Sequence, residues 1–241
     1  MRLGFIGCGT IAAAVVQGLA GQGHEIRVSA RSKARSGMLA AEIPEVQIVT
    51  LQEILDLSEV VFLGLMAEQA EAILTELSFR PGQQVVSFMA GASLEEVGRL
   101  VEPAVAAAIM MPFPGIAQGG SAIMALGGEA LLNQIFGSRN TVFALETAAE
   151  LEAYLCAQAV LSPVARLTAD AASWLGKRVA DPVKGEAFLR MLISTNLAAS
   201  KSEDLIEALN TPGGFNQRLR LHMDEAGMRE DLALGLDRLE E

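Results

Sequence analysis

The sequence has few of the side chains that carry most enzyme chemistry. Its 241 residues include two His, two Cys, one Trp and one Tyr, and aromatic residues make up only 5%. The two cysteines, Cys8 and Cys156, are too few for a disulfide framework or a cysteine-based zinc site. We therefore expect no bound metal. If the protein is an enzyme, much of its chemistry has to come from an organic cofactor.

Positive charge is also scarce. The chain has 18 Lys and Arg against 29 Asp and Glu, a net charge of −11. Nucleic-acid phosphates require clustered Lys and Arg, so we expect no nucleic-acid partner. The uncharged stretch 104–128 is long enough to raise the question of a membrane span, but Pro112, Pro114 and several glycines interrupt it. It is better explained as two buried strands joined by a loop. We expect no membrane partner, and a start without a signal-peptide pattern favours a cytoplasmic location.

Residues 1–147 alternate short apolar runs with helical patterns, and 51% of the whole chain is hydrophobic. Two of the helices are preceded by capping-box pairs, Thr50 with Glu53 and Ser93 with Glu96. Such alternation predicts βαβ units around a buried parallel sheet. The strands are expected at Leu3–Ile6, Glu25–Ala30, Val60–Leu65, Val85–Phe88, Val105–Met110, Ser121–Leu126 and Thr141–Leu145.

The pattern changes beyond about Thr147. Apolar residues then recur only at helical spacing, for example through Val164, Leu167, Ala171 and Leu175. The sequence therefore predicts an α/β Rossmann-type doubly wound sheet followed by an all-α domain. The expected domains are a dinucleotide-binding domain at residues 1–147 and a helical substrate and dimerisation domain at residues 148–241.

A glycine-rich turn follows the first predicted strand. Gly7, Gly9 and Ala12 fit the pattern G-x-G-x-x-A. Gly7 permits the tight turn, Gly9 lets the backbone approach a pyrophosphate, and Ala12 lets the helix pack close to the strand. The helix start, with Thr10 and Ile11, offers free N–H groups to the phosphates. An ordinary strand-to-helix turn is the alternative, but the βαβ context favours dinucleotide binding.

The second predicted strand indicates which dinucleotide. NAD sites usually have an acidic residue at its end for the ribose 2′-hydroxyl. This chain has Arg31, Ser32 and Arg35 there instead and no acid. Arg31 and Ser32 can hydrogen-bond a 2′-phosphate, and Arg35 adds positive potential. We predict NADPH, with NADH less favoured.

The helical part contains one unusual motif, Thr211-Pro212-Gly213-Gly214-Phe215-Asn216. It is either a simple helix–helix turn or a nest in which the N–H groups of Gly213 and Gly214 hold a carboxylate. Spacing alone leaves both open. Ser162 before Pro163 is typical of a helix N-cap with proline at the first helical position.

Several of these segments, taken in chain order, resemble the pyrroline-5-carboxylate reductases. The resemblance rests on the segments Gly4–Gly9, Ser87–Gly91, Met111–Pro112 and Thr211–Gly214. It implies an NAD(P)H-dependent enzyme of proline biosynthesis that is a homodimer or a larger homo-oligomer. Hydride would pass from the nicotinamide to the C=N carbon of a small cyclic imino acid.

The resemblance also implies the roles of individual residues. The substrate would contact Ser162, Thr211, Gly213, Gly214 and Asn216. Further cofactor contacts would come from Leu65, Met66, Ala90, Gly91, Met111 and Pro112.

The chain departs from the family pattern at several of these places. Leu65-Met66 stands where the family has Lys-Pro, Phe113 follows Met111-Pro112 where the family has Asn, and Asn216 replaces a Thr. An Asn amide donates a hydrogen bond but cannot relay a proton, so Asn216 is only a weak candidate catalytic residue. Two alternatives stay open. One is another NADP-linked dehydrogenase of similar layout that uses Lys177, and the other is a non-catalytic dinucleotide-binding regulatory dimer.

Overall fold

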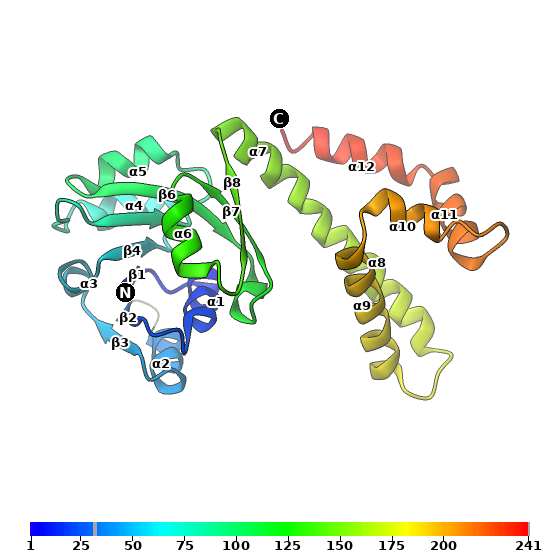
Figure 1. Cartoon of the computed structure of the whole chain (residues 1–241), viewed down its shortest axis with the longest axis horizontal. Coiled ribbons are helices and arrows are strands. Elements are labelled where there is room, and N and C mark those ends of the chain that lie inside the picture. The colour runs from blue at the N-terminus through cyan, green and yellow to red at the C-terminus, as the bar shows by residue number, and fades with distance from the viewer. Residues whose placement is uncertain (31–32, 241) are drawn as a thin grey trace. The chain divides into compact units, whose positions relative to one another are not determined.

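Eight strands form one sheet in the order β3-β2-β1-β4-β5-β6-β7-β8 (Figure 1). The computed structural model describes residues 1–30 and 33–240. β1 to β6 run parallel, β7 is antiparallel to β6, and β8 is parallel to β7. The chain winds outward from β1 to β3 and returns to place β4 on the other side of β1, which confirms the doubly wound sheet. The strands are β1 Arg2–Ile6, β2 Glu25–Ser29, β3 Val46–Val49, β4 Val60–Leu63, β5 Gln84–Ser87, β6 Val105–Pro112, β7 Ala122–Leu126 and β8 Thr141–Leu145.

The helices between these strands begin where the sequence supplies N-terminal caps. Both predicted capping boxes are confirmed. The Thr50 hydroxyl accepts from the Glu53 N–H at 3.3 Å, and the Ser93 hydroxyl accepts from the Glu96 N–H at 3.1 Å. The helical elements are α1 Thr10–Leu19, α2 Lys33–Glu42, α3 Leu51–Leu57, α4 Ala67–Leu74, α5 Leu94–Val101, the 3₁₀ turn η2 Pro114–Ala117 and α6 Glu129–Phe136.

The core fills both faces of the sheet. On one face Phe62 stacks on Phe5 with ring centroids 4.7 Å apart, and Phe136 from α6 meets it edge-on at 6.0 Å. α1, α2 and α6 supply the buried helical residues of this face. On the opposite face α3 lies so close that a Cβ at Gly4 would be 2.5 Å from a methyl of Ile54. Helices therefore cover the sheet on both sides.

The uncharged stretch 104–128 contributes to the same sheet. It forms β6, η2 and β7, as predicted. Among residues 1–30 and 33–240, no helix is long and apolar enough to cross a membrane.

From residue 148 onward every described element is helical, which confirms the predicted all-α segment. The chain divides into two compact units, residues 1–151 and 152–241, so the division falls within α7. In the second unit α8 and α9 pack together as a helical hairpin, and the Asp181 side chain caps α9. The elements are α7 Ala148–Ala157, the 3₁₀ turn η3 Gln158–Val160, α8 Leu161–Gly176, α9 Pro182–Ala199, α10 Ser202–Ala208, α11 Phe215–Glu225 and α12 Met228–Asp237.

Candidate functional site

A hollow of about 230 Å³ opens where the winding of the sheet changes direction, at the carboxyl ends of β1 and β4. Open α/β sheets bind ligands at such switch points. The lining residues come from the glycine turn, the start of α2, the β4–α4 connection and the first turn of α4. They are Gly7, Cys8, Gly9, Arg35, Gly64, Leu65, Met66 and Gln69.

Gly7 has a structural reason to be glycine. Its φ is +88°, and a Cβ there would lie 2.3 Å from the carbonyl oxygen of Gly64. Its N–H donates to the buried hydroxyl of Ser29 at 3.1 Å, which ties the end of β1 to the end of β2. Gly64 is equally constrained, because a Cβ on it would come within 3.0 Å of the Ala12 methyl. The predicted roles of Gly7 and Ala12 in close packing therefore have a geometric basis, and Gly64 is their partner.

In contrast to Gly7, Gly9 has no packing contact that requires a glycine at its position. A Cβ on Gly9 would meet no atom of residues 1–30 and 33–240 within 4 Å, so the described part of the protein leaves this space open. Gly9 is the N-cap of α1, and no side chain caps this helix. The first-turn N–H groups, those of Thr10, Ile11 and Ala12, therefore have no intrahelical acceptor. An open surface with unpaired donors at the positive end of a ten-residue helix fits a pyrophosphate.

One predicted 2′-phosphate ligand lines the same hollow. Arg35 lies in the first turn of α2 beside the glycine turn. Arg31 and Ser32, the other two predicted ligands, lie outside the described residues. Burial raises the pKa of the Cys8 thiol and the Arg35 charge partly offsets that rise, so Cys8 is a protonated, packed side chain at neutral pH.

The β4–α4 connection forms the other wall. Leu65 is buried, whereas Met66 is 65% exposed and is the N-cap of α4 without a side-chain hydrogen bond. These are the predicted cofactor contacts in this segment. Gly64 and Gln69 complete the wall.

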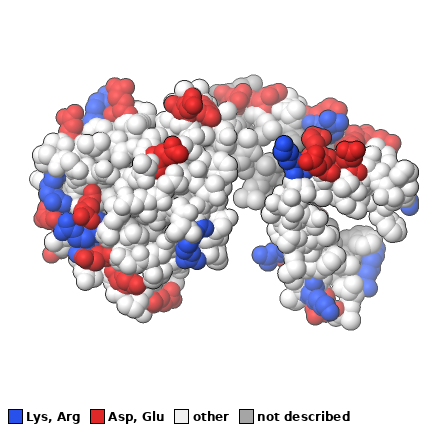
Figure 2. All heavy atoms as spheres, viewed as in Figure 1, with Lys and Arg blue, Asp and Glu red and all other residues white. Residues whose placement is uncertain are grey.

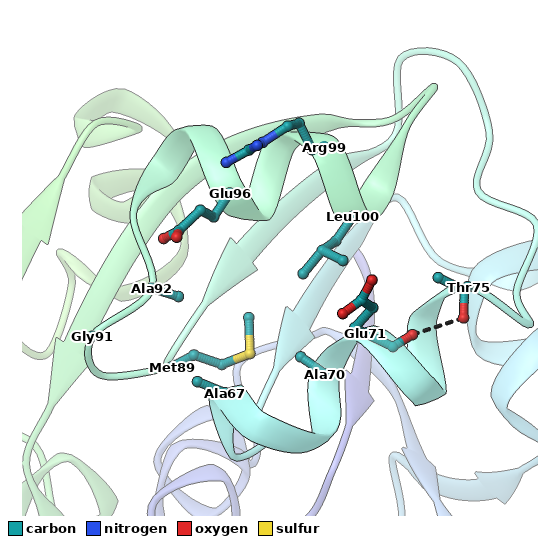
Figure 3. Close-up of a pocket in the computed structure, with 10 residues that line it drawn as sticks. All are labelled: Ala67, Ala70, Glu71, Thr75, Met89, Gly91, Ala92, Glu96, Arg99 and Leu100. Atoms are coloured by element: carbon teal, nitrogen blue, oxygen red, sulfur yellow. Dashed lines mark hydrogen bonds between the residues drawn. The ribbon is translucent and has the colours of Figure 1, made fainter.

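The loop after β5 borders a second cavity, of about 540 Å³, between α4 and α5 (Figure 3). Ala90 and Gly91 lie in this loop, and Gly91 has a φ of +81°. The loop is fixed at its start by the hydroxyl of Ser87, which accepts from the Met89 N–H at 3.1 Å. Met111 and Pro112 end β6 at the same edge of the sheet, because β6 is parallel to β5. The edge thus collects every described cofactor contact predicted for the first unit.

The turn 211–214 leads into α11 in the second unit, and its glycine N–H groups are already bonded. The Gly213 N–H donates to Oε1 of Gln217 at 2.8 Å, and the Gly214 N–H donates to the Thr211 carbonyl at 2.9 Å. Gly213 has a φ of +73°, which explains the glycine there. Asn216 is exposed on the first turn of α11, where no side chain caps the helix. The turn geometry is therefore that of the predicted motif, but the nest is internally occupied.

The interpretation of Ser162 as an N-cap is wrong. α8 begins at Leu161 with Val160 before it, and Ser162 is an exposed residue inside the helix. The chain is helical from 148 through η3 into α8, so no free helix start exists there for Ser162 to cap.

The remaining candidates for polar chemistry are the two histidines and Lys177. His222 is exposed near the end of α11, and Lys177 ends α8 beside a hollow formed with α9. His24 is half-buried in the turn before β2, and burial lowers its pKa. Within residues 1–30 and 33–240, no group of three or more His, Cys, Asp or Glu side chains is placed to hold a metal ion.

Comparison with known proteins gives a family match for part of the chain and similar solved structures for nearly all of it. Residues 2–91 match the family described as NADP oxidoreductase coenzyme F420-dependent. No curated protein matches the chain in a sequence search. Among solved structures, the pyrroline-5-carboxylate reductase of Streptococcus pyogenes is similar with a TM-score of 0.81 and 20% identity, over 99% of this chain and 96% of that one.

Two further structures extend the comparison. The pyrroline carboxylate reductase of Plasmodium falciparum, solved with NADP bound, has a TM-score of 0.81 and 12% identity over 99% of this chain and 95% of that one. A reductive aminase from Aspergillus terreus, in complex with NADPH and ethyl levulinate, has a TM-score of 0.60 and 17% identity over 99% and 92%. The chain thus has the fold of the pyrroline-5-carboxylate reductases, and the resemblance predicted from its motifs is confirmed at the level of the fold.

Proposed function

We propose that the protein is an NADPH-dependent reductase of a cyclic imino acid, pyrroline-5-carboxylate or a related cyclic imine. The observation that carries the proposal is the open Gly9 surface with the uncapped start of α1, at the switch point of the sheet. The matched oxidoreductase family and the fold shared with imine-reducing enzymes support the same reaction class.

The residues of the first unit would hold the cofactor. The N–H groups of Thr10, Ile11 and Ala12 would bind the pyrophosphate, and Arg35, with Arg31 and Ser32, would bind the 2′-phosphate. The nicotinamide would lie at the loop that contains Ala90 and Gly91. The bound cofactor supplies the hydride.

The turn 211–216 would hold the substrate carboxylate. A cyclic imine is already partly protonated at neutral pH, so its reduction needs less acid catalysis than that of a ketone. Orientation and exclusion of water then account for much of the rate, which suits a chain with two histidines. Asn216 would donate a hydrogen bond near the imine without relaying a proton.

We also propose that the working form is a homodimer or a larger homo-oligomer. The support is the exposed apolar surface of the second unit, which includes Phe188 at 59% and Leu219 at 62% exposure. Exposed apolar side chains in this number are typical of an association surface.

The direct test follows NADPH absorbance at 340 nm with purified protein and a panel of cyclic imines, with and without a carboxylate. The proposal predicts imine-dependent oxidation of NADPH, faster than that of NADH. Binding of NADPH with no turnover on any imine would instead favour the non-catalytic dinucleotide-binding alternative. That alternative draws support from the occupied glycine N–H groups of the turn.

A further inference from the structure

The side chain of Gln217 is built into the turn that the proposed function assigns to the substrate carboxylate. Its Oε1 accepts from the Gly213 N–H at 2.8 Å, and its Nε2 donates to Oδ1 of Asn210 at 3.1 Å. Gln217 lies in the first turn of α11, four residues after Gly213, and thus bridges the two ends of the turn. The amide oxygen of Gln217 thus occupies the position from which an oxygen of a bound carboxylate would accept the Gly213 N–H.

The orientation of this amide is fixed by its neighbours. The Arg220 guanidinium, which can only donate, gives a hydrogen bond to Oδ1 of Asn210 at 2.9 Å and an ion pair to Asp224 at 3.1 Å. Asn210 must therefore present its oxygen, so Gln217 must present its NH₂ to Asn210 and its oxygen to Gly213. The hydrogen bonds between Arg220 and Gly213 are therefore consistent with only one orientation of the Asn210 and Gln217 amides.

We propose that Gln217 is a specificity-determining residue that substitutes for the substrate carboxylate when a ring without one is bound. This inference rests on the proposed function, because it takes the turn as the carboxylate site. In a turn without Gln217, a carboxylate-free ring that covers the turn would displace water from the Gly213 N–H and offer no acceptor in its place, and sites with donors left unpaired in this way reject such ligands. With Gln217 present, the donor stays satisfied, and both kinds of ring bind.

Displacement of Gln217 by a substrate carboxylate is energetically accessible. A carboxylate is a stronger acceptor than a neutral amide, and the bond from Gly213 to Gln217 lies at an exposed position, so the released amide is hydrated at once. The net preference for the carboxylate-bearing ring is therefore reduced, and the chain discriminates weakly between the two classes of imine.

The test compares kcat/KM for pyrroline-5-carboxylate with kcat/KM for 1-pyrroline, which has the same ring without the carboxylate. Gln217→Met keeps the length and the helix propensity of the side chain but removes the acceptor. We expect Gln217→Met to raise the ratio of kcat/KM for pyrroline-5-carboxylate to kcat/KM for 1-pyrroline about fivefold to tenfold, which corresponds to the free energy of one hydrogen bond. The change should appear in KM, with kcat little changed. Gln217→Glu puts a permanent charge at the turn and is expected to lower the ratio by a similar factor. Gln158→Met, the same change at η3, is the control and is expected to leave the ratio unchanged.

A second readout needs no turnover. With glycine-selective ¹⁵N labelling, tetrahydrofuran-2-carboxylate should shift the Gly213 amide resonance of the parent protein, whereas tetrahydrofuran should not. Gln217→Met should bind this carboxylate more tightly, and Gln217→Glu should bind it more weakly. Equal carboxylate affinity and equal ratios in all three proteins would overturn the role of Gln217. Absence of imine reduction with an intact Gly213 response would overturn the proposed function alone.

Discussion

The two units of the chain are stabilised in different ways. In residues 1–151 the strands and helices bury a continuous set of apolar side chains on both faces of the sheet, whereas no residue of α8 to α12 is buried. Twenty of the twenty-six exposed large apolar side chains of the described residues lie in 152–241. Figure 2 shows that Lys, Arg, Asp and Glu are scattered over the visible face, with broad uncharged areas between them. The first unit therefore has its own core, whereas the second leaves many large apolar side chains exposed.

The largest expected difference in stability is between two phenylalanine substitutions, one in each unit. Phe62 contacts the rings of Phe5, Phe88 and Phe136, so Phe62→Ala is expected to lower the free energy of unfolding by about 3–5 kcal/mol. Phe188 is 59% exposed in α9, so Phe188→Ala should change chain stability by less than about 0.5 kcal/mol while weakening self-association.

Urea unfolding measures the first quantity, and sedimentation velocity across a dilution series measures the second. Equal stability losses for the two variants, with unchanged association, would remove the distinction between the units.

The next effect separates folding from cofactor binding at the glycine turn. Gly7→Ala forces a Cβ against the Gly64 carbonyl in a left-handed backbone conformation, at a cost of about 1–3 kcal/mol. Gly9→Ala meets no atom of the described residues and keeps an allowed backbone, so the stability of this variant should change by at most about 1 kcal/mol. Its added methyl, however, lies where the pyrophosphate would approach.

We therefore expect Gly9→Ala to raise the NADPH dissociation constant at least about tenfold, equivalent to roughly 1.4 kcal/mol. Thermal melts and isothermal titration calorimetry on both variants provide the test. If Gly9→Ala binds NADPH like the parent protein, the assignment of this surface to the pyrophosphate is incorrect.

The smallest effect concerns helix caps, one from each unit. Ser93→Ala removes the capping box of α5 and Asp181→Ala removes the cap of α9, and each is expected to cost about 1 kcal/mol. The pKa of Glu96 is held below its usual value by the hydrogen bond from the Ser93 N–H. The contribution of this hydrogen bond to the free energy of unfolding is fully present above pH 4.5, the ordinary pKa of Glu96. It is lost as the pH falls through the lowered pKa.

Ser93→Ala keeps the backbone N–H of residue 93, so the pH dependence is measured on Glu96→Gln. The stability difference between the parent and Glu96→Gln should shrink as unfolding is measured at successively lower pH below 4.5. A difference that stays constant down to pH 2 would show that Glu96 takes no part in the cap.

Local sequence patterns predicted most of the first unit. The alternation of strand and helix signals is read directly from hydrophobic spacing, and the strand predicted at Thr141–Leu145 has the same bounds in the structure. Gly64 was not predicted, because its need for a small side chain arises from contact with Gly7, which is distant in sequence. The only local signal was a glycine directly after a buried strand.

In the second unit, the wrong interpretation of Ser162 as an N-cap has a local cause. Ser162 before Pro163 is a typical helix start, but the preceding residues stay helical and the cap is not used. The glycine pair 213–214 correctly predicted a turn. The closure by Gln217 depends on which donors and acceptors meet across that turn, and residue spacing alone does not encode this.

The account is tested most directly by following the hydride. NADPH carrying deuterium at C4 of the nicotinamide, on either face in turn, is incubated with the protein and pyrroline-5-carboxylate, and the product is analysed by mass spectrometry and NMR. The account predicts proline that carries one deuterium on the former C=N carbon from one of the two labelled faces. Product without deuterium from either face, or no proline at all while NADPH binds, would contradict it.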